Sequence, residues 1–282
     1  MHQDISDEEL KRIIRVVEDQ GLTISYFKKD FLKRRIKSRM LMTKKDTVAE
    51  YYNLIKRDRN EVISLLDSAF INVSEFFRDP PLWDALSVIL RSLSRNNFIR
   101  IWSAGCSCGE EPYSLALLIS ETLPNNGSVR IIATDIDENA LKIAASGIYD
   151  QKSLRNVQPY LLSRYFIKEG DDKFRASERL KELVRFSKHD ITKDRIFMYC
   201  DIILCRNLMI YFPREVQREL IKKFWSALKP GGYLVIGMSE ILGEEDLKYF
   251  EPHNTRLRIY RKREVPRFSS SRDSPTDKDL LV

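Results

Sequence analysis

Residues that hold metals or form cross-links are scarce in this sequence. Its 282 residues include four cysteines and three histidines. The cysteines form a C-x-C pair, Cys106 and Cys108, and a C-x4-C pair, Cys200 and Cys205, and neither spacing matches a common zinc site. Each lies in a strand-like or loop context, where a small thiol packs well in a core. The sequence therefore predicts no metal site, and reduced cysteines that fit the cytosol.

Long apolar runs are absent as well. No run approaches the roughly 18 residues of a membrane-spanning helix, and the N-terminus is acidic and polar, unlike a signal peptide. Hydrophobic residues still make up 43% of the chain, enough for one large domain or a large domain with a small one. We therefore expect a soluble, cytoplasmic protein without membrane insertion.

Acidic residues are outnumbered by basic ones. The chain has 48 Lys and Arg against 41 Asp and Glu, a formal net charge of +7. Such an excess suits an acidic partner, which can be nucleic acid, an anionic membrane or an acidic protein. It equally suits any soluble protein whose net charge lies away from zero. Composition alone leaves these alternatives open.

Residues 1–75 are predicted to form an all-helical domain. Ser6 to Glu9 reads as a capping box before apolar residues at helical spacing, Thr47 to Glu50 reads as a second, and a fourth helix starts near Asn60. Between the boxes, a helix expected over residues 24–41 is rich in basic side chains. This basic face suits an acidic partner, and a solvated charged surface is the alternative. Its candidate contact residues are Lys33, Arg34, Arg35, Lys37 and Arg39.

The hydrophobic pattern of residues 98–262 differs from that of the N-terminal region: short apolar runs alternate with amphipathic helices. This pattern predicts an α/β fold with a mostly parallel sheet covered on both faces. Residues 76–97 form the linker and connecting helix, 146–186 are too long for a simple crossover and form an inserted subdomain, and 263–282 form a disordered tail. The expected strands are 98–102, 129–134, 184–187, 202–205, 233–237 and 257–260, and the expected helices are 112–123, 138–145 and 214–228.

The stretch IWSAGCSCGEEPYS, residues 101–114, predicts a ligand loop. Gly105 and Gly109 follow a strand and precede a helix, a context in which glycine lets the backbone approach a ligand. Glu110 and Glu111 stand where a phosphate loop would have Lys or Ser. Two carboxylates repel a pyrophosphate and favour a ligand with a positive charge and hydroxyl donors, as S-adenosylmethionine has. A tight turn without a ligand is the alternative.

Polar side chains follow the second and fourth strands. Asp135 ends the second, where an acid accepts hydrogen bonds from ribose hydroxyls in doubly wound nucleotide-binding folds. Arg206 and Asn207 end the fourth, and Tyr211 follows closely. Asp135 as a helix cap is an alternative, although Asp137 is better placed, and Tyr211 as a half-buried core residue is another. The glycine loop, its two acids and Asp135 together favour an adenosine-containing cofactor.

These motifs resemble those of the chemotaxis receptor glutamate methyltransferases, the CheR family, over about residues 5–262. The matching segments are INVSEFFRD, IWSAGCSCGEEPYS, ATDID, SGIY, CRNLMIYF and LKPGGYLVIGMSE, in the family's order. The resemblance implies a Rossmann-like class I S-adenosylmethionine methyltransferase sheet, a small N-terminal all-helical domain and an inserted antiparallel β-subdomain. It also implies methylation of glutamate side chains on chemoreceptor cytoplasmic helices, which gives methyl esters and S-adenosylhomocysteine during adaptation.

The resemblance further implies positions that bind the cofactor. Ser74 stands where the family often has Thr and keeps the hydroxyl, while Asp190 stands where Asn is common and keeps an acceptor for the adenine amino group. Cys108 stands where Thr is frequent, and we expect binding to survive that change. The implied contacts, with Gly105 added from the loop, are Asn72, Ser74, Arg78, Gly105, Glu111, Asp135, Asp190, Ile191, Arg206 and Asn207.

The implied reaction asks little of acid–base chemistry. The attacking glutamate, with a reference pKa of about 4.3, is already ionised at neutral pH, so no general base is needed. In-line placement in a dry site is the harder requirement. We expect Arg78 and Tyr211 to act as catalytic residues that orient the carboxylate and close the site. The basic residues of 24–41 would steer the enzyme to acidic receptor helices.

Two alternatives of other kinds stay open. A methyltransferase acting on another protein, nucleic acid or a small molecule fits the basic charge, but C-R-N-L replaces any N-P-P-Y-like motif and no aromatic platform for bases is evident. A non-catalytic S-adenosylmethionine-binding sensor or scaffold is the other, against which the loop acids, Asp135, Arg206 and Tyr211 argue. We expect a chemoreceptor partner, no nucleic acid and a monomer. The stretch IKEGDDKFRAS has one glycine, which predicts no dependence on a receptor C-terminal peptide tether.

Overall fold

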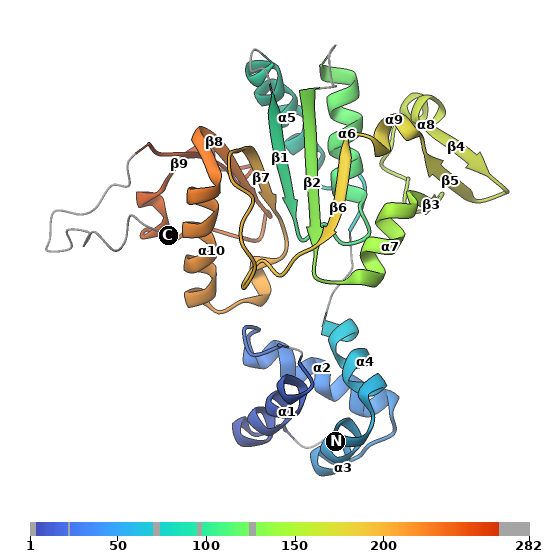
Figure 1. The fold of residues 1–282 in the computed structure, drawn as a ribbon, viewed down its shortest axis with the longest axis vertical. Helices are drawn as coiled ribbons and strands as arrows, with labels where there is room; N and C mark the ends of the chain where they lie inside the picture. Colours follow the sequence, from blue (N-terminus) through green and yellow to red (C-terminus); the bar gives the residue numbers. More distant parts are fainter. Residues whose placement is uncertain (1–3, 22, 70–73, 95–97, 124–127, 265–282) are drawn as a thin grey trace, which may run out of the picture. The chain divides into compact units, whose positions relative to one another are not determined.

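The structure is a computed structural model in which the chain forms two compact units (Figure 1). It describes residues 4–21, 23–69, 74–94, 98–123 and 128–264. The N-terminal unit comprises Met1–Val73 with Leu208–Gln217, and the sheet unit comprises Ser74–Asn207 with Arg218–Val282. Asn72 and most of the predicted tail lie outside the described residues. None of the described helices is long and apolar enough to cross a membrane.

The N-terminal unit contains the predicted helices. Both capping boxes are confirmed, since Ser6 and Thr47 each accept a hydrogen bond from the backbone three residues on, and the glutamate there reaches back. The helix expected over 24–41 begins only at Lys29. The backbone N–H of Lys28 donates to the carbonyl of Tyr211 at 2.9 Å instead of continuing a helix backwards. The helices are α1 (Asp7–Asp19), α2 (Lys29–Met42), α3 (Val48–Arg57) and α4 (Arg59–Ala69).

A segment distant in sequence completes this unit. Residues 208–217 contain the short 3-10 helix η2 (Met209–Tyr211), and Lys28 Nζ donates to the Ile210 carbonyl at 2.8 Å. The Phe212 ring stacks on Phe27 with centroids 5.7 Å apart, and the Tyr211 ring lies 4.9 Å from that of Phe31. An aromatic cluster therefore joins this segment to α2 and the turn before it.

A buried ion pair ties α2 to α4. The Arg39 guanidinium donates to both oxygens of the buried Glu61, at 2.9 and 2.6 Å, and the Tyr51 hydroxyl donates to Glu61 at 2.9 Å. The bond to Glu61 raises the pKa of Arg39, and burial raises the pKa of the Tyr51 phenol. The Arg39 guanidinium and the Tyr51 phenol thus keep the protons that they donate to Glu61.

The sheet unit contains the predicted mostly parallel sheet. Strand order is β6-β2-β1-β7-β8-β10-β9; the first five pair in parallel, and β10 pairs antiparallel with β8 and β9. The Leu86 and Leu115 side chains of the helices join Ile101 and Ile131 of the strands in one buried cluster. The elements are α5 (Pro80–Leu93), β1 (Ile99–Ala104), α6 (Glu110–Thr122), β2 (Val129–Asp135), α7 (Glu138–Ser146), β6 (Val184–Lys188), β7 (Cys200–Cys205), α10 (Arg214–Ala227, of which the residues up to Gln217 belong to the N-terminal unit), β8 (Leu228–Ile236), η3 (Asp246–Lys248), β9 (Phe250–Asn254) and β10 (Ile259–Lys262).

Strand β9 was not among the predicted strands. It contains Pro252, which has no N–H group and cannot donate to a neighbouring strand. β9 pairs with β10 alone, so it lies at the edge of the sheet, where a missing donor is tolerated.

A small antiparallel sheet is inserted between β2 and β6, as the fold prediction required (Figure 1). Its strands run in the order β3-β5-β4, and Phe76 packs edge-on against Tyr149 of β3 and Phe166 of β4. The insert is thereby anchored to the segment that precedes α5. Its elements are β3 (Ile148–Asp150), α8 (Pro159–Tyr165), β4 (Phe166–Glu169), β5 (Lys173–Ala176) and α9 (Glu178–Lys181).

The Arg39–Glu61 pair yields a stability prediction. Glu61→Ala leaves a largely buried guanidinium without its counter-charge, so we expect the free energy of unfolding to fall by about 3–5 kcal/mol. Glu8→Ala removes an exposed partner of Lys11 and serves as the control, with no measurable change expected. Denaturant unfolding of both variants measures the difference, and equal effects would contradict a structural role for the buried pair.

Candidate functional site

The glycine loop turns back onto the end of β2. The Thr134 carbonyl accepts from the backbone N–H groups of Gly105 and Cys106, at 2.8 and 2.9 Å. Gly105 and Ser107 both have left-handed backbone conformations, with φ of +78° and +50°. The loop backbone is therefore fixed where parallel strands end and ligands bind in such sheets.

The second glycine of the loop is required by packing. Gly109 has φ of +95°, and a Cβ atom there would lie 2.8 Å from both Ala144 Cβ and the Tyr149 hydroxyl. Tyr149 also donates to the Cys108 carbonyl at 2.8 Å. The close approach of α7 and β3 therefore excludes any side chain at this position. Gly109 is explained without invoking a ligand.

Arg206 lies at the centre of the site. Its side chain is 3% exposed, and its two terminal nitrogens contact Glu111 Oε2, at 3.1 Å, and Asp79 Oδ2. It also donates to the Arg78 carbonyl at 3.3 Å, and Ser103 donates to Glu111 Oε1 at 2.8 Å. Three predicted cofactor residues, Arg78, Glu111 and Arg206, are thus brought together. The positive charge that Glu111 contacts is the guanidinium of Arg206, which belongs to the protein itself and not to a ligand.

The segment around Arg78 is held by its neighbours. Phe76 is fully buried, Phe77 packs on Trp83, and the Phe77 backbone N–H donates to Ser114 Oγ at 2.9 Å. Both phenylalanines therefore anchor the segment. Phe77 and Asp79 both have positive φ, +50° and +58°, so the backbone is strained on either side of Arg78.

Asp135 keeps acceptor capacity for a ligand. Each carboxylate oxygen accepts one backbone N–H, from Ser107 at 2.8 Å and from Asp137 at 3.0 Å, while burial raises its pKa. Asp137, as predicted, is the residue that caps α7, with bonds from Asn139 and Ala140. A carboxylate offers about four acceptor positions, so the remaining ones suit hydroxyl donors.

The segment after β6 joins the same edge. The backbone N–H of His189 donates to the Asp135 carbonyl at 2.9 Å, and Ile191 is buried. Asp190 Oδ1 accepts from the backbone and the hydroxyl of Thr192, at 2.9 and 2.6 Å. Asp190 therefore forms the turn itself and has its second oxygen for a further donor.

Sequence reasoning missed Glu240. This buried carboxylate accepts from the backbone N–H groups of Asn207, at 3.2 Å, and Gly237. Asn207 was predicted as a cofactor residue, and its φ of +59° is left-handed. The acid lies far along the chain from Asn207, and no local pattern in the sequence links the two. The signal available was its place directly after the strand of LKPGGYLVIGMSE.

The first loop glutamate differs from the second. Glu110 is buried, its carboxylate accepts from the Ser74 hydroxyl, and burial raises its pKa. Among the described residues, its Oε2 atom has no hydrogen-bond partner. Ser74, a predicted cofactor residue, is therefore oriented by Glu110. Of the two loop acids, Glu111 is the one that pairs with a cation.

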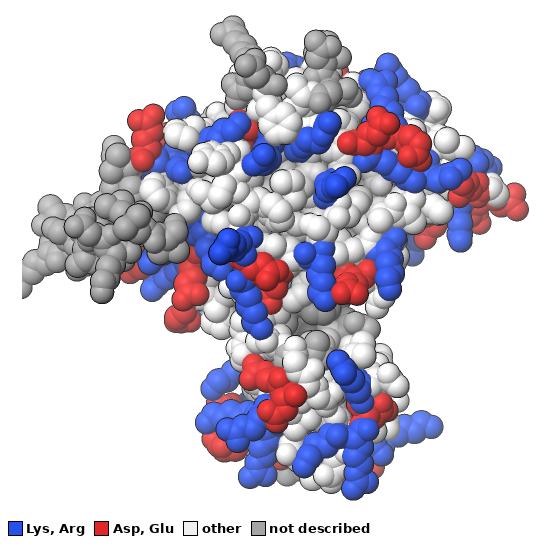
Figure 2. All heavy atoms as spheres, in the orientation of Figure 1, with Lys and Arg blue, Asp and Glu red and all other residues white. Residues whose placement is uncertain are grey.

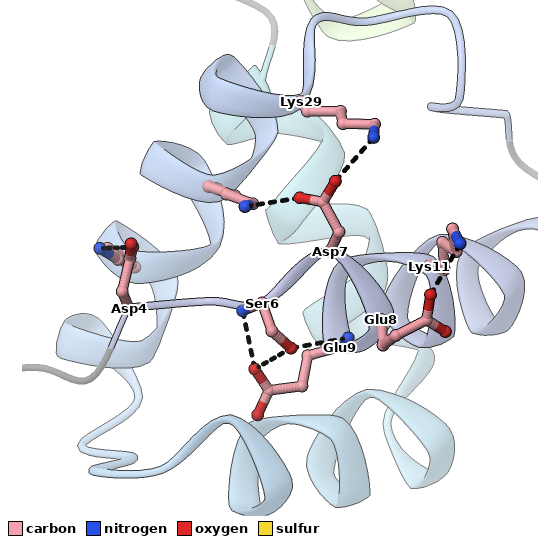
Figure 3. A network of polar contacts seen from close by, with 9 residues as sticks. Asp4, Ser6, Asp7, Glu8, Glu9, Lys11 and Lys29 are labelled. Carbon is pink, nitrogen blue, oxygen red and sulfur yellow. Dashed lines mark hydrogen bonds and ion pairs between the residues drawn. The ribbon is translucent and has the colours of Figure 1, made fainter.

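Tyr211 and the basic residues belong to the N-terminal unit. Lys33 and Lys37 pair with Asp7 and Asp4 at 2.8 and 2.9 Å, and Figure 3 shows Asp7 facing Lys29 as well. Figure 2 likewise shows acidic side chains interspersed with basic ones on this unit.

The remaining predicted contact residues of α2 differ in their surroundings. Arg39 is bound by Glu61, the Arg35 guanidinium lies 5.1 Å from the centre of the Phe31 ring, and Arg34 is exposed. The five predicted contact residues are therefore not equivalent, and Arg39 has a structural role.

The charges at the strand ends fit S-adenosylmethionine. Two carboxylates flank one guanidinium at Arg206, so this edge keeps a negative charge that favours a sulfonium and an ammonium group over a phosphate. Asp135 adds acceptors for ribose hydroxyls. Glu111, Arg206 and Asp135 thus offer the charges and acceptors that this cofactor requires.

Comparison with known proteins identifies two matching family models. They are "CheR methyltransferase, SAM binding domain", over residues 72–258, and "CheR methyltransferase, all-alpha domain", over residues 8–69. A chemotaxis protein methyltransferase of Borreliella burgdorferi is 37% identical over 266 residues, which cover 88% of this chain and 94% of that protein. Proteins of the same description from Listeria monocytogenes and Escherichia coli are 37% and 31% identical, covering 80% and 84% of this chain and 87% and 85% of theirs.

The raised pKa of Glu110 gives a pH prediction. The folded protein holds this proton more tightly than the unfolded chain, so above the folded-state pKa the buried charge lowers the free energy of unfolding. Glu110→Gln should therefore stabilise the protein at pH 7, and the gain should disappear as the pH falls from the raised folded-state pKa of Glu110 to the usual glutamate range.

The neighbouring residue supplies the control for this prediction. Glu111→Gln makes the same chemical change but removes the counter-charge of Arg206, so it should destabilise at pH 7. Thermal unfolding of both variants from pH 4 to 8 measures the two effects. Destabilisation by Glu110→Gln at pH 7 would contradict the penalty assigned to this charge.

Proposed function

The chain belongs to the CheR methyltransferase family, and on this premise we propose that it transfers the methyl group of S-adenosylmethionine to glutamate side chains of a chemoreceptor. Methylation with this cofactor in chemotaxis is the activity of the family. The observation that carries the proposal is the meeting of Arg206, Glu111 and the Arg78 backbone at the strand ends, in the sheet unit that matches the S-adenosylmethionine-binding model.

We assign the cofactor to the strand ends of the sheet unit. When bound, S-adenosylmethionine supplies an electrophilic methyl group on a sulfonium. Asp135 accepts from the ribose hydroxyls, Asp190 and Ile191 hold the adenine, and Glu111 with Arg206 sets the charge of the site. Supporting contacts come from Asn72, Ser74, Arg78, Gly105 and Asn207.

The protein's part in the reaction is placement. The substrate carboxylate is ionised at neutral pH, so no side chain has to remove a proton. Arg78 orients the carboxylate by its charge, and the Tyr211 hydroxyl donates to it and excludes water. Both are proposed as the catalytic residues, and their contribution is to hold the nucleophile in line with the methyl group.

Substrate docking is assigned to the basic helix α2. Arg34 and Arg35 attract the acidic receptor helices, and Lys33 and Lys37 exchange their exposed intrachain partners for receptor carboxylates. Arg39 contributes through the integrity of the unit, since Glu61 binds it. We further propose that the enzyme acts as a cytoplasmic monomer on protein alone, without nucleic acid or a receptor peptide tether.

Methyl transfer to a purified chemoreceptor cytoplasmic fragment tests the proposed reaction. Label from S-adenosylmethionine should appear on the fragment and leave as methanol in mild base, because a glutamate methyl ester is base-labile. Arg78→Ala and Tyr211→Phe should each lower kcat by roughly tenfold or more. Arg91→Ala and Tyr160→Phe, the same changes at exposed positions, serve as controls. Base-stable label, or full activity in both catalytic variants, would contradict the assignment.

Charge reversal on α2 tests docking. Arg34→Glu should raise KM for the receptor fragment roughly threefold to tenfold, with kcat little changed and the effect shrinking at high salt. Arg15→Glu reverses an exposed charge on α1 of the same unit and is the control. Equal KM values for the two variants would show that the position of the charge on α2 does not matter.

A further inference from the structure

We infer that Glu240 is a positioning residue of the cofactor site, acting through the backbone of Asn207. The inference rests on the proposed function, because Asn207 is there a cofactor contact. Glu240 reaches the end of β7 from the turn that follows β8, the neighbouring parallel strand. Nothing in the sequence-based assignment of cofactor residues includes this carboxylate.

One carboxylate oxygen joins two strand ends. Glu240 Oε2 accepts from the backbone N–H of Asn207, directly after β7, and from that of Gly237, directly after β8. The backbone N–H of Glu240 in turn donates to the Gly237 carbonyl at 2.9 Å, which closes the turn. Glu240 is 5% exposed, so these bonds form away from competing water.

The held backbone is in a left-handed conformation. Asn207 has φ of +59°, in a small allowed region that Asn enters more readily than most residues with a side chain but that is not its usual conformation. The hydrogen bond from the Asn207 backbone N–H to Glu240 stabilises this conformation. Removing the carboxylate leaves two donors at the strand ends without this acceptor and lets Asn207 relax toward the right-handed region.

Gly237 shows how closely the two strand ends approach. A Cβ atom at this position would lie 2.8 Å from Asn207 N, 3.0 Å from Asn207 Nδ2 and 2.9 Å from Glu240 Oε2. The Asn207 backbone and amide therefore rest against a position that only glycine can occupy. Gly237 provides the space, and Glu240 provides the bond that sets Asn207.

Glu240 affects the cofactor site through Asn207. This residue follows Arg206, whose guanidinium is fixed by Glu111 and Asp79. The side chain of Arg206 is thus held by one set of contacts and the next backbone unit by another. By holding the Asn207 backbone, Glu240 sets the direction of the Asn207 side-chain amide. This side-chain amide is the group that contacts the cofactor in the proposed site.

A double-mutant cycle on cofactor binding tests this role. S-adenosylhomocysteine is titrated into the full-length protein by calorimetry for wild type, Glu240→Ala, Asn207→Ala and the double variant. Glu240→Ala should weaken binding roughly tenfold. The double variant should bind no more than about twofold more weakly than Asn207→Ala, since both changes remove the same contact. Ser239→Ala, at the adjacent exposed position, is the control and should bind like wild type.

A conservative variant separates positioning from stability. Glu240→Gln keeps an oxygen that accepts from both N–H groups, so it should recover most of the lost affinity. KM for the receptor fragment should stay unchanged throughout, because the docking helix α2 lies in the other unit. If Glu240→Ala does not fold, Glu240→Asp replaces it in the cycle, because its shorter side chain cannot reach both donors.

Several outcomes overturn the inference. Losses that multiply in the double variant would show that Glu240 does not act through Asn207. If Glu240→Ala lowers the melting temperature but binds S-adenosylhomocysteine with wild-type affinity, Glu240 has only a structural role. If wild type binds S-adenosylhomocysteine but methylates no receptor, the proposed substrate fails while the cycle still decides the role of Glu240. A wild type that does not bind it would refute both.

Discussion

The buried guanidinium of Arg206 is the interaction on which the site depends. A cation that is 3% exposed requires partners that replace water, and it finds them in Glu111 at the start of α6 and Asp79 before α5. The contact with the Arg78 carbonyl adds a third chain segment. The glycine loop, the segment before α5 and the tip of β7 are therefore fixed to one another by a single side chain. Removing it would leave Asp79 and Glu111 without their shared counter-charge.

This arrangement also explains the loop acids. A carboxylate in a glycine loop is a poor partner for a phosphate, and Glu111 is stable there because Arg206 compensates it. Asp79 supplies a second negative charge, so the group as a whole still favours a cationic ligand. Glu110 differs from Glu111 in that it lies buried beside Ser74, and burial raises the pKa of its carboxyl group. Adjacent identical residues thus have separate roles, set by the direction in which α6 presents each side chain.

Much of the fold was predictable from local pattern. Caps at Ser6, Thr47 and Asp137 follow from side chains that bond to the nearby backbone, and the parallel strands follow from short apolar runs. The start of α2 was not predictable, because a carbonyl from Tyr211 ends the helical pattern there. Strand β9 was not predicted; it contains Pro252, which a sheet tolerates at an edge, and edge position is a property of the assembled sheet.

The sequence predicted which residues lie at the site but not which of them bind one another. Strand ends identified Asp135, Arg206 and Asn207, since ligands bind at that edge. That Arg206 binds Glu111, and that Glu240 binds the Asn207 backbone, depends on segments that meet only in the folded sheet. Glycine motifs were least informative, because Gly109 is explained by the contact with Ala144 and Tyr149.

The excursion of residues 208–217 has an evolutionary consequence. The N-terminal unit is not a contiguous piece of chain, because the aromatic residues Tyr211 and Phe212, which follow β7, pack against Phe31 and Phe27. An N-terminal unit exchanged between relatives by recombination at residue 74 would arrive without this part of its core. The sequence of the segment after β7 therefore has to suit the aromatic residues of the N-terminal unit as well as its place between β7 and α10.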